Sequence, residues 1–186
     1  MKLSYLLLPL ACLLAQPAGA VELITNGDFE WPLDTGWISG MSGSGASITR
    51  GTSHDEDPDY EVYLRKPTGS GHVRVSQTVS VPGTDATFSA RLKMNASATM
   101  TAWAASALIL TYQDAGGQAL GETRYVVRSQ HCPWQSSPTL HIVLPDPGVW
   151  TDIAFTLDEE LPNLPGIDPM LVQQVEVALY GLVEDC

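Results

Sequence analysis

The chain has 186 residues and is acidic, with 21 Asp and Glu against 9 Lys and Arg and a formal net charge of −12. An acidic surface disfavours nucleic acids and anionic membranes as partners, whereas neutral glycans, cations and basic proteins remain compatible with it. The charge also serves solubility outside the cell, and we expect that to explain most of it.

The first twenty residues have the layout of a secretory signal peptide. Met1-Lys2 is a short positive start, Leu3 to Leu14 is an apolar run, and Ala18-Gly19-Ala20 is a small-residue cleavage signal. A lipoprotein signal ending at Cys12 is an alternative. We therefore expect residues 1–20 to be removed and residues 21–186 to form a single exported domain, secreted or periplasmic, without membrane insertion.

The remaining chain is predicted to be all-β, since alternating apolar and polar residues recur between Gly, Pro, Asn and Asp clusters. The predicted strands cover 73–79 and 87–94, a hairpin of 99–113 and 118–129 around a turn at 114–117, and then 153–157 and 175–179. The Gly/Ser stretch at 40–47 is predicted as a loop, and Asp168-Pro169 as the start of one short helical turn. This pattern predicts a two-sheet antiparallel β-sandwich.

One motif near the start is more specific. Leu23 to Glu30 reads LITNGDFE and is followed by Gly36-Trp37. It resembles the opening of galactose-binding-domain-like β-sandwiches, the jelly-roll fold of many carbohydrate-binding modules, in which a strand, an Asn-Gly-x-Phe-Glu turn and a Gly-Trp pair follow one another. The segment at 75–79 resembles the Ser-Gln-x-Val strand of the same family. The resemblance implies that Phe29 and Trp37 close one end of the core.

The resemblance also implies a structural calcium ion. In the family, the Glu of the opening motif, a loop after the second strand and an acid at the end of the last strand supply the ligands. The matching residues are Glu30, Asp55 and Asp57 of the 54–60 loop, and Asp185. Carboxylate oxygens suit calcium. The alternative is that the 54–60 segment is simply a solvated acidic loop.

Sugar sites combine aromatic platforms with a few polar groups. Trp31 and Trp134 lie in loops beside proline and are candidate platforms, whereas Trp37 and Trp150 are expected in the core. One set of strand residues is expected to face the core: Val73, Leu92, Tyr125, Phe155 and Val177. Strand alternation then places a second set of side chains on the opposite, outward faces of the sheets. Its members are Arg74, Arg91, Arg124, Arg128, Glu176 and Tyr180. They form either a polar groove for an oligosaccharide, which could carry carboxylates, or a solvated face on which arginines pair with Glu122 or Glu176.

Two cysteines remain after cleavage, Cys132 and Cys186. In an exported chain such a pair predicts a disulfide. Two free thiols, or pairing between molecules, are the alternatives.

These patterns predict a non-catalytic carbohydrate-binding module. A structural or adhesive protein of the cell envelope without a small ligand is the main alternative. A jelly-roll polysaccharide lyase is a third, with Tyr125 or Tyr180 carrying the proton and Arg124 or Arg128 neutralising a uronate. The common nucleophile, metalloprotease and phosphate-binding motifs do not occur in the sequence.

Overall fold

A computed structural model describes residues 21–53, 59–99 and 102–185. Nearly all of the regular structure in these ranges is β-strand. The strands are β1 (Ile38–Met41), β2 (Ser47–Gly51), β3 (Glu61–Arg65), β4 (Gly71–Ser80), β5 (Thr87–Lys93), β6 (Ala102–Gln113), β7 (Ala119–Arg128), β8 (Leu140–Val143), β9 (Trp150–Thr156) and β10 (Gln174–Asp185). Three short helical turns, α1 (Leu157–Glu160), η1 (Leu161–Asn163) and η2 (Pro169–Leu171), lie between β9 and β10. The predicted signal peptide lies outside the described residues.

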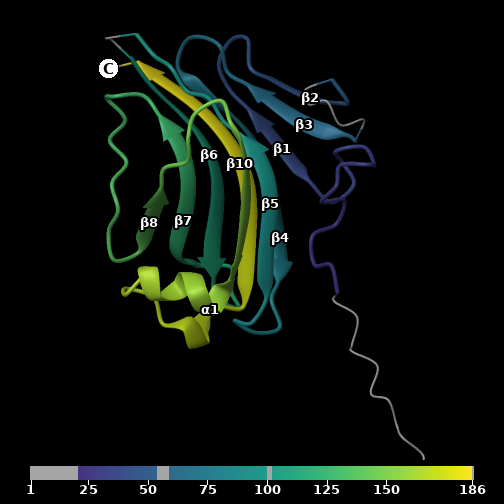
Figure 1. Cartoon of the computed structure of the whole chain (residues 1–186), viewed down its shortest axis with the longest axis vertical. Helices are drawn as coiled ribbons and strands as arrows, with labels where there is room; N and C mark the ends of the chain where they lie inside the picture. Colours follow the sequence, from purple (N-terminus) through teal and green to yellow (C-terminus); the bar gives the residue numbers. More distant parts are fainter. Residues whose placement is uncertain (1–20, 54–58, 100–101, 186) are drawn as a thin grey trace, which may run out of the picture.

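One layer is a six-stranded sheet in the order β1-β4-β10-β6-β7-β8 (Figure 1). The central strand β10 pairs over its whole length with β6 and over most of its length with β4. All of its pairs are antiparallel except β7 with β8, which is parallel. The expectation of purely antiparallel sheets is therefore wrong at this edge, because β8 is reached through a long connection and not through a tight hairpin.

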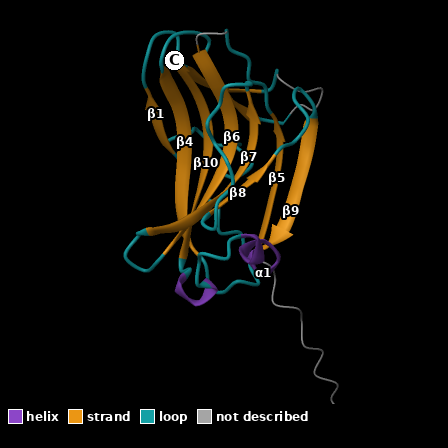
Figure 2. Cartoon of the chain, turned by 90° about the vertical axis from the view of Figure 1, so that its left-hand side faces the viewer, coloured by secondary structure: helices purple, strands orange, loops and turns teal. Residues whose placement is uncertain are grey.

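The second layer consists of two separate strand pairs, β5 with β9 and β2 with β3. Figure 2 shows β5 and β9 standing to one side of the six-stranded sheet. Apolar residues of both layers form one buried cluster, which includes Leu108 and Leu110 from β6 and Leu92 and Ile153 from β5 and β9. The predicted all-β sandwich is confirmed, with a second layer made of two pairs.

Alternation along the strands separates the two faces of the six-stranded sheet. The core side carries Val75, Leu108 and Val177, each nearly inaccessible to solvent. The side chains expected to face the core are all buried or packed against the core: Val73, Leu92, Tyr125, Phe155 and Val177. The opposite side of the sheet, called the outward face below, carries the polar side chains of Arg74, Arg124, Arg128, Glu176 and Tyr180.

The predicted hairpin between β6 and β7 is present, and its turn explains the sequence there. The carboxylate of Asp114 accepts from the backbone N–H groups of Gly116 and Gln118 at 2.8 and 2.9 Å. Gly117 has a φ of 79°, a conformation that glycine adopts without strain. An Asp two residues ahead of a glycine pair therefore closes this turn.

The segment from α1 to η2 closes one end of the sandwich. Thr156 and Glu159 form a reciprocal capping box that starts α1. Leu157, Leu161 and Leu164 are buried in the core. The short turn expected at Asp168-Pro169 is confirmed as η2, with the Asp168 side chain accepting from Met170 N–H.

Other expectations differ from the structure at the start of the chain. The opening motif is a turn and not a strand, since residues 24–28 bend and Asn26 and Phe29 both have positive φ. Part of the expected 40–47 loop belongs to β1 and β2. These two strands, like β3 and β8, have only four or five residues, too few for alternation to identify them.

The Asn26 side chain nevertheless holds this corner together. Its amide accepts from Trp31 N–H at 2.8 Å and donates to the carbonyls of Trp31 and Pro32. Its backbone carbonyl accepts from the Trp37 indole at 3.0 Å. Phe29 and Trp37 lie 5.2 Å apart between ring centroids at the edge of the core, as the motif predicted.

In the described part of the chain, every helix is too short to cross a bilayer.

Candidate functional site

The outward face of the six-stranded sheet brings together most of the predicted binding residues. Arg74 on β4 lies directly opposite Tyr180 on β10. The next positions in that row, on β6 and β7, are Ala107 and Val126. The neighbouring row runs from Ser76 through Ala178 and Ile109 to Arg124. Ala107, Ala178 and Val126 in these rows are buried, and the longer polar side chains of Arg74, Arg124 and Tyr180 stand around them.

The loop between β7 and β8 adds an aromatic side chain to this face. Trp134 packs with Trp103, in an edge-to-face arrangement with centroids 5.9 Å apart, over the cluster that contains Ala105 and Ala107. The Arg128 guanidinium donates to the Trp134 carbonyl oxygen. An arginine on the sheet thus fixes the loop that carries the tryptophan.

Three roughly parallel rings, called the aromatic strip below, cross this face: His72, Tyr180 and Trp134. The centroids of His72 and Tyr180 are 5.9 Å apart with 23° between the planes. Those of Tyr180 and Trp134 are 6.3 Å apart with 26° between the planes. The strip joins β4, β10 and the β7–β8 loop, which are far apart in sequence.

The arginines beside the strip have carboxylate partners. Arg74 pairs with Glu176 across β4 and β10 at 2.7 Å. Arg124 pairs with Glu122 two residues earlier on the same strand at 2.5 Å, and its guanidinium lies 4.3 Å from the Trp134 ring centroid. The ion pairing expected from the sequence is therefore present. Such half-exposed pairs contribute only up to about 1 kcal/mol each, so their main effect is to hold the guanidinium groups in place.

The tyrosines have protonation states that bear on the lyase interpretation. Burial raises the pKa of Tyr180, with a further contribution from Glu184, so its phenol stays protonated and serves as a hydrogen-bond donor. Tyr125 lies on the core side of β7 against Phe155, and burial raises its pKa to about 12. Tyr125 is therefore wrongly placed to act with Arg124, which belongs to the outward face.

Two predicted binding residues lie elsewhere. Arg91 is on β5, in the second layer, where it lies near Asp152 and over the Trp150 ring. Alternation correctly turned Arg91 away from the core, but it could not say to which sheet the strand belongs. Trp31 is 66 % exposed on the Asn26 corner and belongs to no aromatic pair in the described structure.

Two of the four predicted calcium ligands, Glu30 and Asp185, lie among the described residues. The Glu30 carboxylate faces the backbone N–H of Tyr60 at 3.5 Å, whereas the Asp185 carboxylate accepts from the Ser70 hydroxyl at 2.8 Å. Within the described ranges, no group of three His, Cys, Asp or Glu side chains could hold a metal ion. Asp55 and Asp57 lie outside those ranges, and the calcium site stays a prediction.

The disulfide also stays a prediction. Cys132 is half-buried, and its thiol is free in the structure. Its expected partner Cys186 lies outside the described residues.

A buried polar network on the core side was not anticipated from the sequence. Glu160 of α1 is only 5 % exposed, and its carboxylate accepts from the Thr123 hydroxyl at 2.6 Å. It also contacts His141 Nδ1 at 2.6 Å and Asn163 Nδ2 at 3.1 Å. The Thr123 hydroxyl donates its one proton to Glu160. The Tyr112 hydroxyl, 3.0 Å from the Thr123 oxygen, is therefore the donor in the bond between these two residues. The network ties α1 to β6, β7 and β8, which suits a structural role.

No protein-family model and no curated protein matches the chain. Similar solved structures include the enzymatically active domain of tailspike protein 4 of bacteriophage CBA120. The two chains have 14 % sequence identity and a TM-score of 0.43, and the match covers 88 % of this chain and 22 % of that chain. A structure of promiscuous carbohydrate-binding modules of the β-sandwich superfamily has 10 % identity and a TM-score of 0.42 over 81 % of this chain and 52 % of that one. The chain thus spans about a fifth and about half of their lengths.

The family 11 carbohydrate-binding module of a Clostridium thermocellum cellulosomal cellulase is similar over nearly its whole length. It has 17 % identity and a TM-score of 0.37, over 89 % of this chain and 93 % of that chain. The assignment as an all-β sandwich rests on the strand topology described above, and these similarities add no argument to it. They carry no argument about a ligand.

Proposed function

We propose that the chain is an exported, non-catalytic carbohydrate-binding module that holds a glycan across the outward face of its six-stranded sheet. The observation that supports this proposal is the aromatic strip, with Arg74 and Arg124 held beside it by their carboxylate partners. Export is proposed from the composition of residues 1–20.

The chemistry of the strip suits sugars. Aromatic faces pack against the C–H surfaces of pyranose rings, while nearby guanidinium, carboxylate and phenol groups form hydrogen bonds with hydroxyls. The protonated Tyr180 phenol supplies a donor, and Glu122 and Glu176 supply acceptors.

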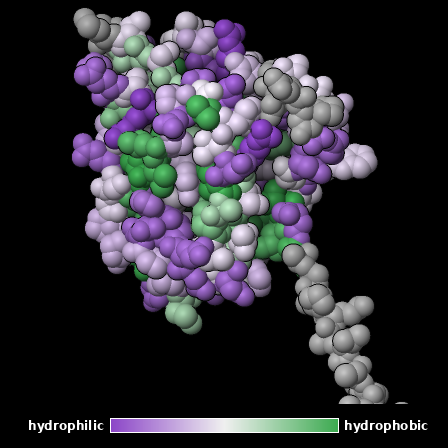
Figure 3. All heavy atoms as spheres, in the orientation of Figure 1, coloured by the Kyte–Doolittle hydropathy of each residue, from purple (hydrophilic) through white to green (hydrophobic). Residues whose placement is uncertain are grey.

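Figure 3 looks onto the side of the molecule that carries β5 and β9, where separate apolar patches lie among hydrophilic residues. The outward face lies on the opposite side of the molecule.

The test is binding to a panel of neutral and acidic polysaccharides, followed by calorimetry with oligosaccharides of any glycan that is retained. Trp134→Ala is expected to weaken binding roughly tenfold or more, as truncation of a central aromatic contact commonly does. Trp31→Ala is the matched control, since Trp31 is exposed and lies outside the strip. Thermal melts of both variants establish that they are folded.

Equal affinity of the Trp134 variant and the wild type would remove the strip from the binding site. A failure of the wild type to bind any glycan would instead favour the structural or adhesive alternative. A rise in ultraviolet absorbance on incubation with an acidic polysaccharide would indicate an unsaturated product and overturn the non-catalytic assignment.

A further inference from the structure

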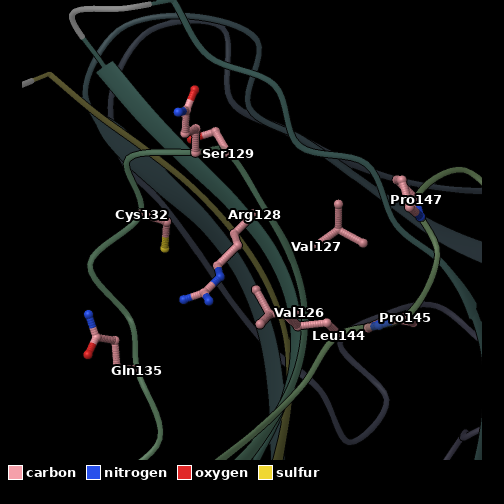
Figure 4. A pocket seen from close by; sticks show the side chains of 10 residues that line it. Val126, Val127, Arg128, Ser129, Cys132, Gln135, Leu144, Pro145 and Pro147 are labelled. Carbon is pink, nitrogen blue, oxygen red and sulfur yellow. The ribbon is translucent and has the colours of Figure 1, made fainter.

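A hollow of about 580 Å³ lies beside the outward face, at the edge of β7 (Figure 4). Its walls come from the end of β7, the loop after it, and the chain that leaves β8 at Leu144. Its volume falls within the range of small-molecule sites, roughly 300–1,000 Å³.

The hollow exists because β8 is shorter than β7. The pairing of β8 with β7 ends at Tyr125 opposite Val143, and Val126 to Arg128 extend beyond it. Pro145 and Pro147 follow, and proline cannot continue a ladder because it lacks an N–H. The edge of β7 therefore borders the hollow for three residues.

Backbone hydrogen-bonding groups of this edge point toward the hollow. Ser129 N–H donates to Ala104 on the β6 side, and Glu122 N–H donates to Thr139 on the β8 side. Because these directions alternate along a strand, the backbone groups of Val126 and Arg128 point to the β8 side, where the neighbouring strand has ended.

The Arg128 side chain brings a positive charge to the hollow. Figure 4 shows its guanidinium on the side of the Cys132 and Gln135 loop. One of its nitrogens donates to the Trp134 carbonyl, which is neutral. Unlike Arg74 and Arg124, Arg128 has no carboxylate within ion-pair distance among the residues that the structure describes. In a chain of net charge −12, this is a concave site with an uncompensated cation.

We propose that this hollow is a subsite for the carboxylate of an acidic sugar, so that the glycan held by the aromatic strip is a polyuronate. The inference rests on the proposed function. Arg128 lines the hollow and also anchors the loop that carries Trp134, so one residue links the hollow to the strip. The remaining guanidinium N–H groups and the Gln135 amide donate to the carboxylate, while the exposed Leu144 side chain contacts the apolar side of the ring.

The test compares oligogalacturonate and oligomannuronate with their methyl esters, which keep the sugar backbone and remove the charge. The wild type is expected to bind a free acid at least about tenfold more tightly than its ester, as a hydrogen bond to a charged group implies. Arg128→Gln is expected to bring the two affinities together, with a clearly larger loss of affinity for the acid than for the ester. Arg128→Lys keeps a charge and a donor for the loop, and is expected to retain part of the preference.

Equal affinity of the wild type for acid and ester, or a preference that survives Arg128→Gln, would overturn this inference. The proposed function would still stand if Trp134→Ala weakened both ligands. Sodium glucuronate bound as tightly as the oligomers would make the hollow a general small-carboxylate site and refute the polyuronate assignment. An equal loss of affinity for the acid and the ester in both Arg128 variants would mean that Arg128 only anchors the loop, which would also overturn the inference.

Discussion

Replacing Glu160 by alanine tests whether the buried network holds the helical segment onto the sheet. The carboxylate has three side-chain partners, Thr123, His141 and Asn163, at 2.6, 2.6 and 3.1 Å. Its removal leaves the fully buried Thr123 hydroxyl without its acceptor. Losing one member of a buried, hydrogen-bonded charged group costs about 3–5 kcal/mol of unfolding free energy.

Urea denaturation of the wild type and Glu160→Ala measures this loss directly, with an unchanged m-value expected if both states keep their compactness. In a chain of this size, each kcal/mol lowers the melting midpoint by about 2–4 °C. Glu160→Gln keeps the side-chain volume and one acceptor, and we expect it to fall between the alanine variant and the wild type.

Asp158→Asn is the matched control on the same helix, because Asp158 is exposed, and it should change stability by no more than about 0.5 kcal/mol. A loss below about 1 kcal/mol in Glu160→Ala would show that the network is not a structural tie. The reasoning from burial and hydrogen bonds would then be refuted at this site.

Three further predictions address other parts of the molecule. Burial raises the pKa of Tyr125 to about 12, so the protonated phenol contributes its full stabilisation below pH 10 and loses it as the pH rises toward 12. The free energy of unfolding of Tyr125→Phe should therefore fall less steeply with rising pH than that of the wild type. An unchanged dependence of stability on pH would contradict the raised pKa. Asn26→Ala removes the acceptor for Trp31 N–H and two donor contacts, and is expected to lower stability by about 1–3 kcal/mol in calorimetry; a loss within experimental error would mean that the corner holds without this amide. Glu30→Ala should lower the melting midpoint only in the presence of calcium, and an equal drop in chelator would argue against a metal at this residue.

The outward face was predictable because strand alternation is a local property. Arg74, Arg124 and Tyr180 each follow from the period of two within one strand. That Trp134 joins them was not predictable, since it comes from a loop whose path depends on Arg128 and Trp103. Alternation likewise could not show that Arg91 belongs to the other layer.

The sequence by itself determined the β class, the core sides of the long strands, the β6–β7 hairpin and the contact of Phe29 with Trp37. These features depend on periodicity, turn chemistry and a short motif, which act over a few residues. Only the tertiary structure decided the strand order, the parallel β7–β8 pair, the aromatic strip, the hollow at Arg128 and the buried Glu160 network. Each of these joins segments distant in sequence, and the pattern within any one segment carries no information about its partner.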